Sequence, residues 1–168
     1  MPVDRSHWIP AYIGLGSNLD DPAAQVQAAI SRLHELPATR LIACSPLYAT
    51  APFGPVAQPD FVNAVAAVLS QSPLQEFFAA LRALETRLGR VKPPERWGPR
   101  RIDLDLLVFG TQRQVGPQLT LPHPGIVERN FVLYPLADVA PDLEVPGLGR
   151  VSQLRAQVSA AGIRRLPR

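Results

Sequence analysis

The sequence has little cysteine and no long apolar run. Cys44 is the only cysteine among 168 residues, which excludes an internal disulfide and a zinc site built from several cysteines. The longest apolar runs, such as residues 64–69, are far too short to cross a bilayer. The first residues contain no apolar core of the kind that a secretion signal needs. The sequence therefore predicts a cytoplasmic protein that does not enter a membrane.

Lysine is nearly absent as well. Lys92 is the only lysine, and the other 16 of the 17 basic residues are arginines, against 14 acidic residues and a formal net charge of +3. Seven of the basic residues lie within residues 82–101, and five arginines with no acid lie within residues 150–168. Concentrated arginine suits a phosphate-bearing partner, either a nucleotide or a nucleic acid. A genome rich in arginine codons is the simpler explanation for the tail, and a weaker one for the central cluster.

Composition and patterning indicate one α/β (α+β) domain. With 46% hydrophobic and 18% charged residues, the chain has a globular composition, and we expect the domain to span residues 1–168 with peripheral tails at 1–8 and about 155–168. Apolar β-rich segments predict four strands, and apolar residues at helical spacing predict two helices. The strands are expected at residues 8–15, 41–49, 61–69 and 102–109, and the helices at residues 21–36 and 72–88. The resulting β-α-β-β-α-β order is the ferredoxin-like pattern, an antiparallel sheet with two helices covering one face.

Local signals mark the ends of these elements. Asp21, before a proline, predicts the N-cap of the first helix. Ser72 and Gln75 form the pattern of a capping box at the start of the second helix, and Gly89 is expected to end it. Pro46 predicts a bend or a sheet edge within residues 41–49.

The common nucleotide-binding motifs are missing. Gly14 and Gly16 resemble the opening of a dinucleotide fingerprint, but the third glycine and a second βαβ unit are absent. Lys92 has no preceding glycine frame, which excludes a Walker A loop. A nucleotide, if one binds, must therefore be held by other residues.

Asp103 and Asp105 form the pattern with the clearest chemistry. Residues i and i+2 of a strand project from one face, which holds the two carboxylates about 6–7 Å apart while the flanking aliphatic residues bury the other face. Mg²⁺ prefers such carboxylates together with phosphate oxygens. A solvated strand face that pairs with Arg100 and Arg101 is the alternative for this short motif.

The basic segment directly before these aspartates favours the metal interpretation. Arginines beside a divalent ion are what a polyphosphate needs, and transfer to an alcohol requires positioning and charge neutralisation more than a strong base. On another strand, Phe61 and Asn63 share a face that suits a planar heterocycle, although a core Phe beside a buried Asn is the alternative. Phe131 is a candidate for the opposite wall. His123 has no metal-ligand partners in the sequence, so a phosphate contact and a plain surface histidine both stay open.

Several segments together resemble the 6-hydroxymethyl-7,8-dihydropterin pyrophosphokinases of folate synthesis. They are residues 11–19, 54–64, 89–90, 121–123 and 129–131, and above all the Arg-Trp-Gly-Pro-Arg-x-x-Asp-x-Asp string at residues 96–105. The resemblance runs from about residue 11 to residue 146. It implies a ferredoxin-like α/β fold, two Mg²⁺ ions, ATP as donor, AMP as product, and small molecules as the only partners of a monomer, with a dimer as the alternative.

The resemblance also implies roles for individual residues. Arg90 and Arg100 would be the catalytic arginines, and Asp103 and Asp105 would bind both Mg²⁺ ions. The ATP site would be lined by Lys92, Arg96, Trp97, Arg100, Thr120, His123 and Arg129. The pterin would be surrounded by Thr50, Pro52, Phe53, Phe61, Asn63 and Phe131. Loops around Gly16, residues 50–58 and residues 90–97 would close over the substrates. The chain departs from the family pattern at Phe61, Lys92, Gln118 and Pro124.

Two other classes of protein share some of these sequence features. RNA-binding domains also use a ferredoxin-like sheet with aromatics and arginines, but the usual aromatic string is missing and the acidic pair would repel phosphates in the absence of a metal. A nucleotide-sugar transferase with an Asp-x-Asp metal site would need a nucleotide-binding βαβ half, which this chain lacks. We therefore expect neither a nucleic-acid nor a membrane partner.

Overall fold

The computed structural model describes residues 7–52, 54–90 and 98–167. Up to residue 109 its strands and helices follow the predicted order, except that one predicted strand is divided in two, and further elements come after residue 110. In chain order they are β1 (Ile9–Ser17), α1 (Pro22–Arg32), a 3-10 turn η1 (Leu33–Glu35), β2 (Thr39–Cys44), β3 (Tyr48–Thr50), β4 (Phe61–Ser70), α2 (Leu74–Arg87), β5 (Asp103–Phe109), α3 (Asn130–Val139), β6 (Glu144–Val145), β7 (Gly149–Arg150), α4 (Val151–Ala156) and β8 (Ile163–Arg165).

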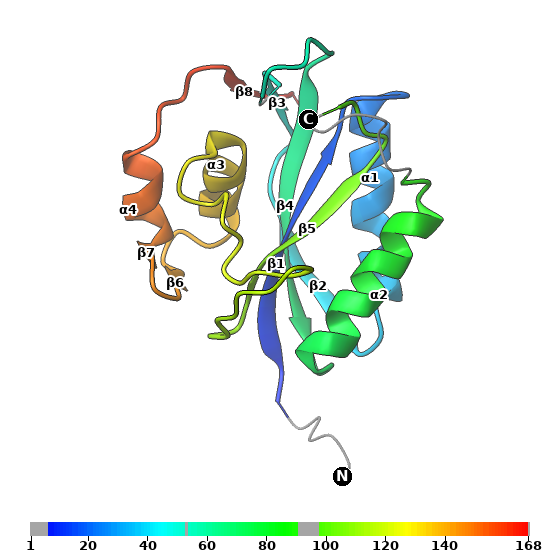
Figure 1. The fold of residues 1–168 in the computed structure, drawn as a ribbon, viewed down its shortest axis with the longest axis vertical. Coiled ribbons are helices and arrows are strands. Elements are labelled where there is room, and N and C mark those ends of the chain that lie inside the picture. The colour runs from blue at the N-terminus through cyan, green and yellow to red at the C-terminus, as the bar shows by residue number, and fades with distance from the viewer. Residues whose placement is uncertain (1–6, 53, 91–97, 168) are drawn as a thin grey trace.

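The main sheet is antiparallel throughout and has the strand order β5-β1-β4-β3-β8, with β2 also pairing with β4 (Figure 1). The strand expected at residues 41–49 is in fact two strands, β2 and β3, which pair with different halves of β4. Pro46 has no N–H to donate to the ladder. Ser45 keeps the chain attached at the break, because its amide donates to the Val65 carbonyl at 2.8 Å and its hydroxyl accepts from the Val65 amide at 2.9 Å.

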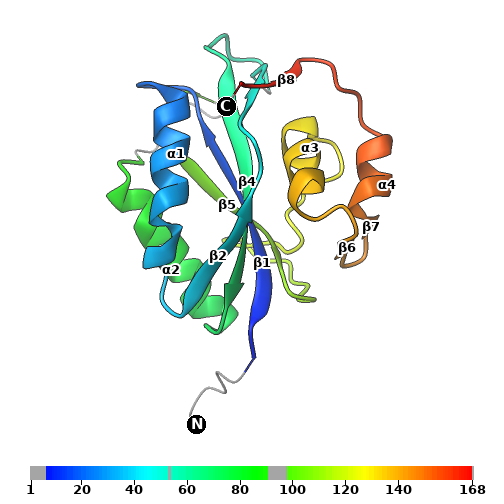
Figure 2. The ribbon, with the colours of Figure 1, turned by 180° about the vertical axis from the view of Figure 1, so that it is seen from behind.

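Helices cover both faces of this sheet (Figures 1 and 2). Helices α1 and α2 pack on one face, as predicted, and their core includes Leu33, Phe77 and Leu104. The third helix, α3, packs on the other face with Leu107 and Val132 in a second core. Helix α3 is not among the elements that the sequence pattern predicts, and its presence means that β4 is buried on both sides.

Two of the three helix-end predictions are confirmed. The Asp21 carboxylate accepts from the Ala24 amide at the start of α1, and Gly89 follows α2 with a φ of 92°, a conformation that glycine adopts without a steric penalty. The prediction of a capping box at the start of α2 is wrong. Pro73 is the N-cap of α2, and the Ser72 hydroxyl instead donates to the Pro37 carbonyl at 2.9 Å, which ties the start of α2 to the turn before β2.

The chain after α3 returns to the sheet. A small hairpin of β6 and β7 leads into α4, and β8 then pairs with β3. Part of the region expected to be a peripheral tail is therefore the outermost strand of the sheet. Within the described ranges no helix has the length and apolar character that a membrane crossing requires.

Candidate active site

A cavity of about 310 Å³ lies on the α3 face of the sheet, where β1, β4 and β5 face the start of α3. Ten of the residues singled out in the sequence line it. They are Thr50, Phe61, Asn63, Arg90, Arg100, Asp103, Asp105, His123, Arg129 and Phe131. Segments far apart in the sequence thus meet in one hollow, which supports the interpretation that these residues act together.

The two aspartates lie where strand alternation places them. Asp103 and Asp105 both line the cavity, whereas Leu104 between them is fully buried in the core on the opposite face. On the neighbouring strand β1, Gly16 pairs with Asp103. A Cβ on Gly16 would lie 2.5 Å from the Asn63 side-chain oxygen, so only glycine lets β1 pass this close to Asn63.

The two carboxylates have different partners. Asp103 binds two arginines, with its Oδ1 2.6 Å from Arg90 Nη1 and its Oδ2 2.7 Å from Arg100 Nη1. Asp105 forms no ion pair or side-chain hydrogen bond with the residues that the structure describes. Burial, and to a lesser extent the charge of Asp103, raises the pKa of Asp105 to about 7. A carboxylate in this state has unused capacity for a cation.

Glu85 on α2 organises the arginines, and the sequence analysis did not single it out. It is 5% exposed, and its Oε1 and Oε2 lie 3.1 Å from Arg82 Nη1 and 3.2 Å from Arg90 Nη1. Its Oε2 also accepts from the Leu104 amide at 2.6 Å, while Arg82 donates to the Leu104 carbonyl. Burial raises the pKa of Glu85, although the Leu104 amide and both arginines oppose the shift.

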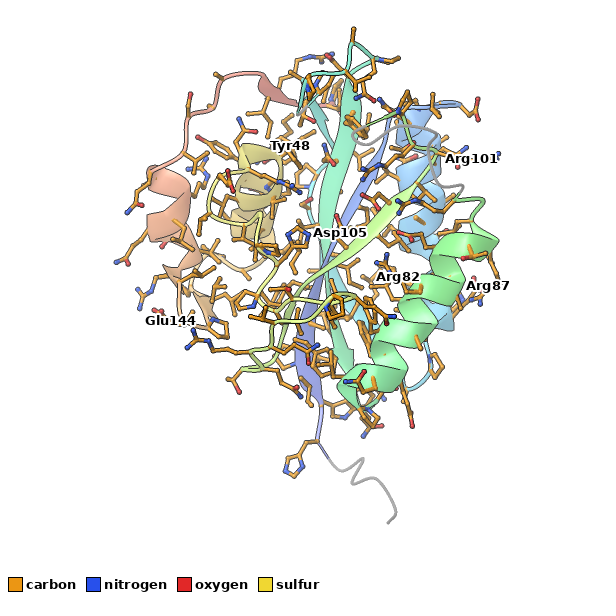
Figure 3. The ribbon with its side chains drawn as sticks, viewed as in Figure 1. Tyr48, Arg82, Arg87, Arg101, Asp105 and Glu144 are labelled. Atoms are coloured by element: carbon orange, nitrogen blue, oxygen red, sulfur yellow. The ribbon has the colours of Figure 1, made fainter. Side chains whose placement is uncertain are left out.

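This arrangement follows from the position of β5 at the edge of the sheet. A strand at an edge leaves backbone groups without a strand partner, and β5 pairs only with β1. Figure 3 shows Arg82 between α2 and β5. Arg82 and Glu85 both bond from α2 to the backbone of Leu104, which lies midway between the two aspartates in the sequence. The spacing of Arg82 and Glu85 on one helix face was visible in the sequence, but their target was not.

The other half of the cavity is aromatic and neutral. Asn63 is buried and donates to the Thr50 hydroxyl at 2.7 Å. Phe61 lines the same wall, as the i, i+2 spacing predicted, and Phe131 lines the cavity from α3. Asn63 is therefore not a core residue satisfied by backbone. A planar ring with hydrogen-bonding edges suits this half.

His123 and Arg129 lie in the same hollow as both halves. The His123 Nδ1 accepts from the Gly125 amide at 3.0 Å, so the hydrogen of the neutral ring is on Nε2. Burial and the charge of Arg129 lower the pKa of His123 to about 4, although Asp103 opposes the shift. The Arg129 guanidinium lies 5.7 Å from the centre of the Phe131 ring. His123 is thus a neutral donor suited to an anion.

A family model of known proteins matches most of this chain. Residues 12–141 match the model described as 7,8-dihydro-6-hydroxymethylpterin-pyrophosphokinase (HPPK). The chain belongs to this family.

Individual relatives agree with the match. A Pseudomonas aeruginosa protein named 2-amino-4-hydroxy-6-hydroxymethyldihydropteridine pyrophosphokinase is 49% identical over 93% of this chain and 96% of its own length. A Haemophilus influenzae protein of the same name is 39% identical over 89% of this chain and 92% of its own. A crystal structure of Plasmodium falciparum HPPK-DHPS superposes with a TM-score of 0.67 and 15% identity over 90% of this chain and 41% of that one, so this chain spans less than half of it. The ferredoxin-like fold is confirmed.

Some residues that the HPPK resemblance implied do not line the main cavity. The Thr120 hydroxyl donates to the Gly116 carbonyl at 3.4 Å. Pro52 lines a smaller adjoining cavity of about 220 Å³, which shares Ala51, Arg129 and Phe131 with the main one. Phe53, Lys92, Arg96 and Trp97 lie outside the described residues, as does most of the loop expected to act as a lid.

Asn18, which the sequence analysis did not select, connects the loops of this HPPK domain. Its side-chain nitrogen donates to the Gln58 side chain at 2.8 Å and to the Pro59 carbonyl at 3.0 Å, and its Oδ1 accepts from the Arg100 amide at 2.8 Å. It is 2% exposed. The segment after β1, the segment before β4 and Arg100 are therefore held as one unit.

The carboxylates of the cavity fit Mg²⁺ better than a metal with an all-protein ligand set. No group of three or more His, Cys, Asp or Glu residues that could hold a metal ion exists among the residues described here. Two adjacent carboxylates are the kind of incomplete set that Mg²⁺ accepts, because it keeps water and substrate phosphate oxygens as its other ligands. The free capacity of Asp105 is consistent with that role.

Proposed function

We propose that this chain transfers the pyrophosphoryl group of ATP to the hydroxymethyl oxygen of 6-hydroxymethyl-7,8-dihydropterin, with release of AMP. One observation carries the proposal. A single cavity of about 310 Å³ joins a half rich in arginines and aspartates to a half made of two phenylalanines, an asparagine and a threonine. A polyphosphate and a planar heterocycle can therefore meet in it, which transfer between them requires.

The arginines supply the charge that a transferring phosphoryl group needs. Arg90, Arg100 and Arg129 line the charged half, and phosphoryl transfer depends mainly on positioning and on neutralising the equatorial oxygens. Glu85 and Asp103 hold Arg90 and Arg100 in fixed positions in the absence of substrate. His123 adds a neutral donor.

Asp103 and Asp105 would hold the divalent ion. When bound, Mg²⁺ would polarise phosphoryl oxygens and offset the charge of both carboxylates. The dependence on Mg²⁺ and the number of two ions are part of this proposal and rest on the chemistry of the donor atoms. In the neutral half, Asn63 and Thr50 would hydrogen-bond the edge of the heterocycle, and Phe131 would stack on its face.

The products of ATP test the reaction directly. Incubation of the protein with ATP, Mg²⁺ and the hydroxymethyl-dihydropterin should give AMP and the pterin diphosphate in equal amounts, and excess EDTA should stop both. ADP as the nucleotide product, or release of orthophosphate, would contradict the proposal.

A matched pair of arginines tests the site. Arg100→Ala should lower the rate by on the order of 10³, as for other arginines that neutralise transferring phosphoryl groups. Arg101→Ala removes the same charge from the next residue, which does not line the cavity, and should leave the rate within about twofold. A loss below tenfold for Arg100→Ala would show that this arginine is peripheral.

The other expectations about partners stay predictions. Among the described residues, two carboxylates face the cavity beside the arginines, which disfavours RNA as its ligand. A monomeric state and a cytoplasmic location are proposed here on the sequence alone.

A further inference from the structure

The segment 159–166 lies along the edge of the sheet beside the cavity. After α4 the chain passes α3 and joins β3, as Figures 1 and 2 both show. The Ala51 amide donates to the Gly162 carbonyl at 2.9 Å, and Ile163 pairs with Thr50. Gly162 has a φ of 76°, which favours glycine at this turn. The segment therefore extends the wall that carries Thr50.

The same segment is bound to the start of α3. The Asn130 side-chain nitrogen donates to the carbonyl oxygens of Ser159 at 3.0 Å and Ala161 at 2.8 Å. Asn130 is the first residue of α3 and directly precedes Phe131. These two bonds hold the start of the helix against the segment.

A third attachment lies more than two helical turns further along α3. Arg165 Nη2 donates to Asp138 Oδ1 at 3.0 Å and to the Tyr48 hydroxyl at 3.3 Å, and the Tyr48 hydroxyl donates to Asp138 Oδ2. Tyr48 belongs to β3 and Asp138 to α3. The segment thus joins β3 to α3 at two separate places.

These contacts connect the two walls of the neutral half of the cavity. One wall contains Thr50, which bonds Asn63, and the other contains Phe131. Ala161 and Gly162 line the adjoining cavity of about 220 Å³ together with Ala51 and Phe131. We propose that residues 159–165 are a positioning strap that sets the separation between Phe131 and the Thr50–Asn63 wall, and hence the fit of the pterin. This inference rests on the proposed function.

The strap is far from the two aspartates in the order of the sheet. β8 and β5 are the outermost strands at opposite edges. Asp103 and Asp105 lie on β5, and Arg90, one of the two arginines that bind Asp103, is also bound by Glu85 of α2. Arg129 is the exception in the charged half, because it precedes Asn130 and lines the adjoining cavity beside Ala161 and Gly162. A change in the strap should therefore alter pterin binding more than ATP binding.

Asn130→Asp tests this with little change of shape. The variant loses both donated bonds and places a carboxylate against two carbonyl oxygens. The KM for the pterin should rise roughly tenfold, as expected for two lost hydrogen bonds that act on one equilibrium. The KM for ATP should rise less than the KM for the pterin, because Arg129 is the ATP-site residue next to the substitution. Amide exchange at Ala51 should become faster.

Arg165→Ala and Arg164→Ala form a second, matched pair. Both remove one charge from the same strand. In the described part of the chain the Arg164 side chain forms no hydrogen bond or ion pair, whereas Arg165 binds Asp138 and Tyr48. Arg165→Ala should raise the KM for the pterin about threefold, and Arg164→Ala should not change it. If Asn130→Asp fails to fold, this pair tests the strap in its place, and equal KM values for the pterin in the two variants would overturn the strap inference.

The outcomes separate the strap from the proposed reaction. If the unmodified protein forms no AMP, the proposed function fails and the strap inference fails with it. If it forms AMP but Asn130→Asp raises both KM values alike, or only lowers the melting temperature, the strap inference alone is overturned.

Discussion

At the residue scale, the two aspartates of β5 differ in what surrounds them. Asp103 binds Arg90 and Arg100, whereas Asp105 is raised in pKa by burial and forms no ion pair with a described residue. A buried carboxylate without a partner destabilises the fold. When a paired carboxylate is removed instead, its arginine partners are left without a compensating charge. The same substitution should therefore have opposite effects at the two positions.

We expect Asp105→Asn to stabilise the metal-free protein by on the order of 1–2 kcal/mol, and Asp103→Asn to destabilise it by about 1–3 kcal/mol. Both should lower turnover by about 10³ or more, because both carboxylates are assigned to the metal. Thermal unfolding in EDTA at pH 8 measures the first effect, and AMP formation measures the second. Equal losses of stability would contradict this account of Asp105.

His123 makes the free energy of unfolding depend on pH. Burial and Arg129 lower the pKa of His123 to about 4, below the value of about 6.5 for an unfolded histidine. Between these values the unfolded chain binds more protons than the folded one, so this contribution is complete above pH 6.5 and is lost as the pH falls towards 4. Asp103 opposes the shift and reduces its size.

His123→Asn should remove this dependence while keeping an acceptor for the Gly125 amide. In urea unfolding at pH 7.5, 6 and 5, the unmodified protein should lose on the order of 1–2 kcal/mol more than the variant across that range. Parallel losses in the two proteins would show that His123 does not carry the effect.

At the scale of elements, α2 completes the edge of β5. Glu85 accepts from the Leu104 amide and binds Arg82 and Arg90, so one carboxylate fixes both the strand and the arginines. Gln in its place would keep an acceptor for Leu104, but it would remove the carboxylate that pairs with Arg82 and leave Arg90 paired with Asp103 alone.

We therefore expect Glu85→Gln to lower kcat about 10- to 100-fold and stability by about 1–3 kcal/mol. Glu35→Gln is the control, because it removes an exposed ion pair with Arg32 away from the cavity, and it should change neither quantity appreciably. If the two variants behave alike in steady-state kinetics and in denaturant unfolding, Glu85 does not position the arginines.

Sequence patterns predicted the features that depend on local periodicity. The alternation of β5 placed Asp103 and Asp105 on one face, and that of β4 brought Phe61 and Asn63 together, as the structure confirms. The two helices on one face of the sheet followed from their apolar spacing. These features depend on residues within a few positions of one another.

Features that depend on strand order could not be predicted in this way. Glu85 matters because β5 is an edge strand, which only the complete sheet reveals. Helix α3 contains Pro135 and packs between the sheet and α4, so it lacks the polar face by which a surface helix is recognised. Strand β8 is three residues long with two arginines, and only its pairing with β3 makes it a strand.

At the scale of the whole molecule, the site lies between opposite edges of one sheet. β5 supplies the carboxylates, β3 and β4 supply Thr50, Phe61 and Asn63, and α3 closes the cavity from the other side. Asn18 bonds the segments that precede β4 and β5, and the strap bonds the first residue of α3. The stability of the sheet and the shape of the cavity are thus coupled.

The pairing of Asp103 with both Arg90 and Arg100 has a consequence for ligand choice. Although the chain as a whole is basic, its own acids cancel much of the positive potential inside the cavity. A polyphosphate without a bound metal ion is repelled by these carboxylates, so its binding is weak. In a phosphate bound to a divalent cation, the cation can contact the carboxylates while the phosphate oxygens contact the arginines. The cavity should therefore prefer phosphates that carry a divalent cation over phosphates without one.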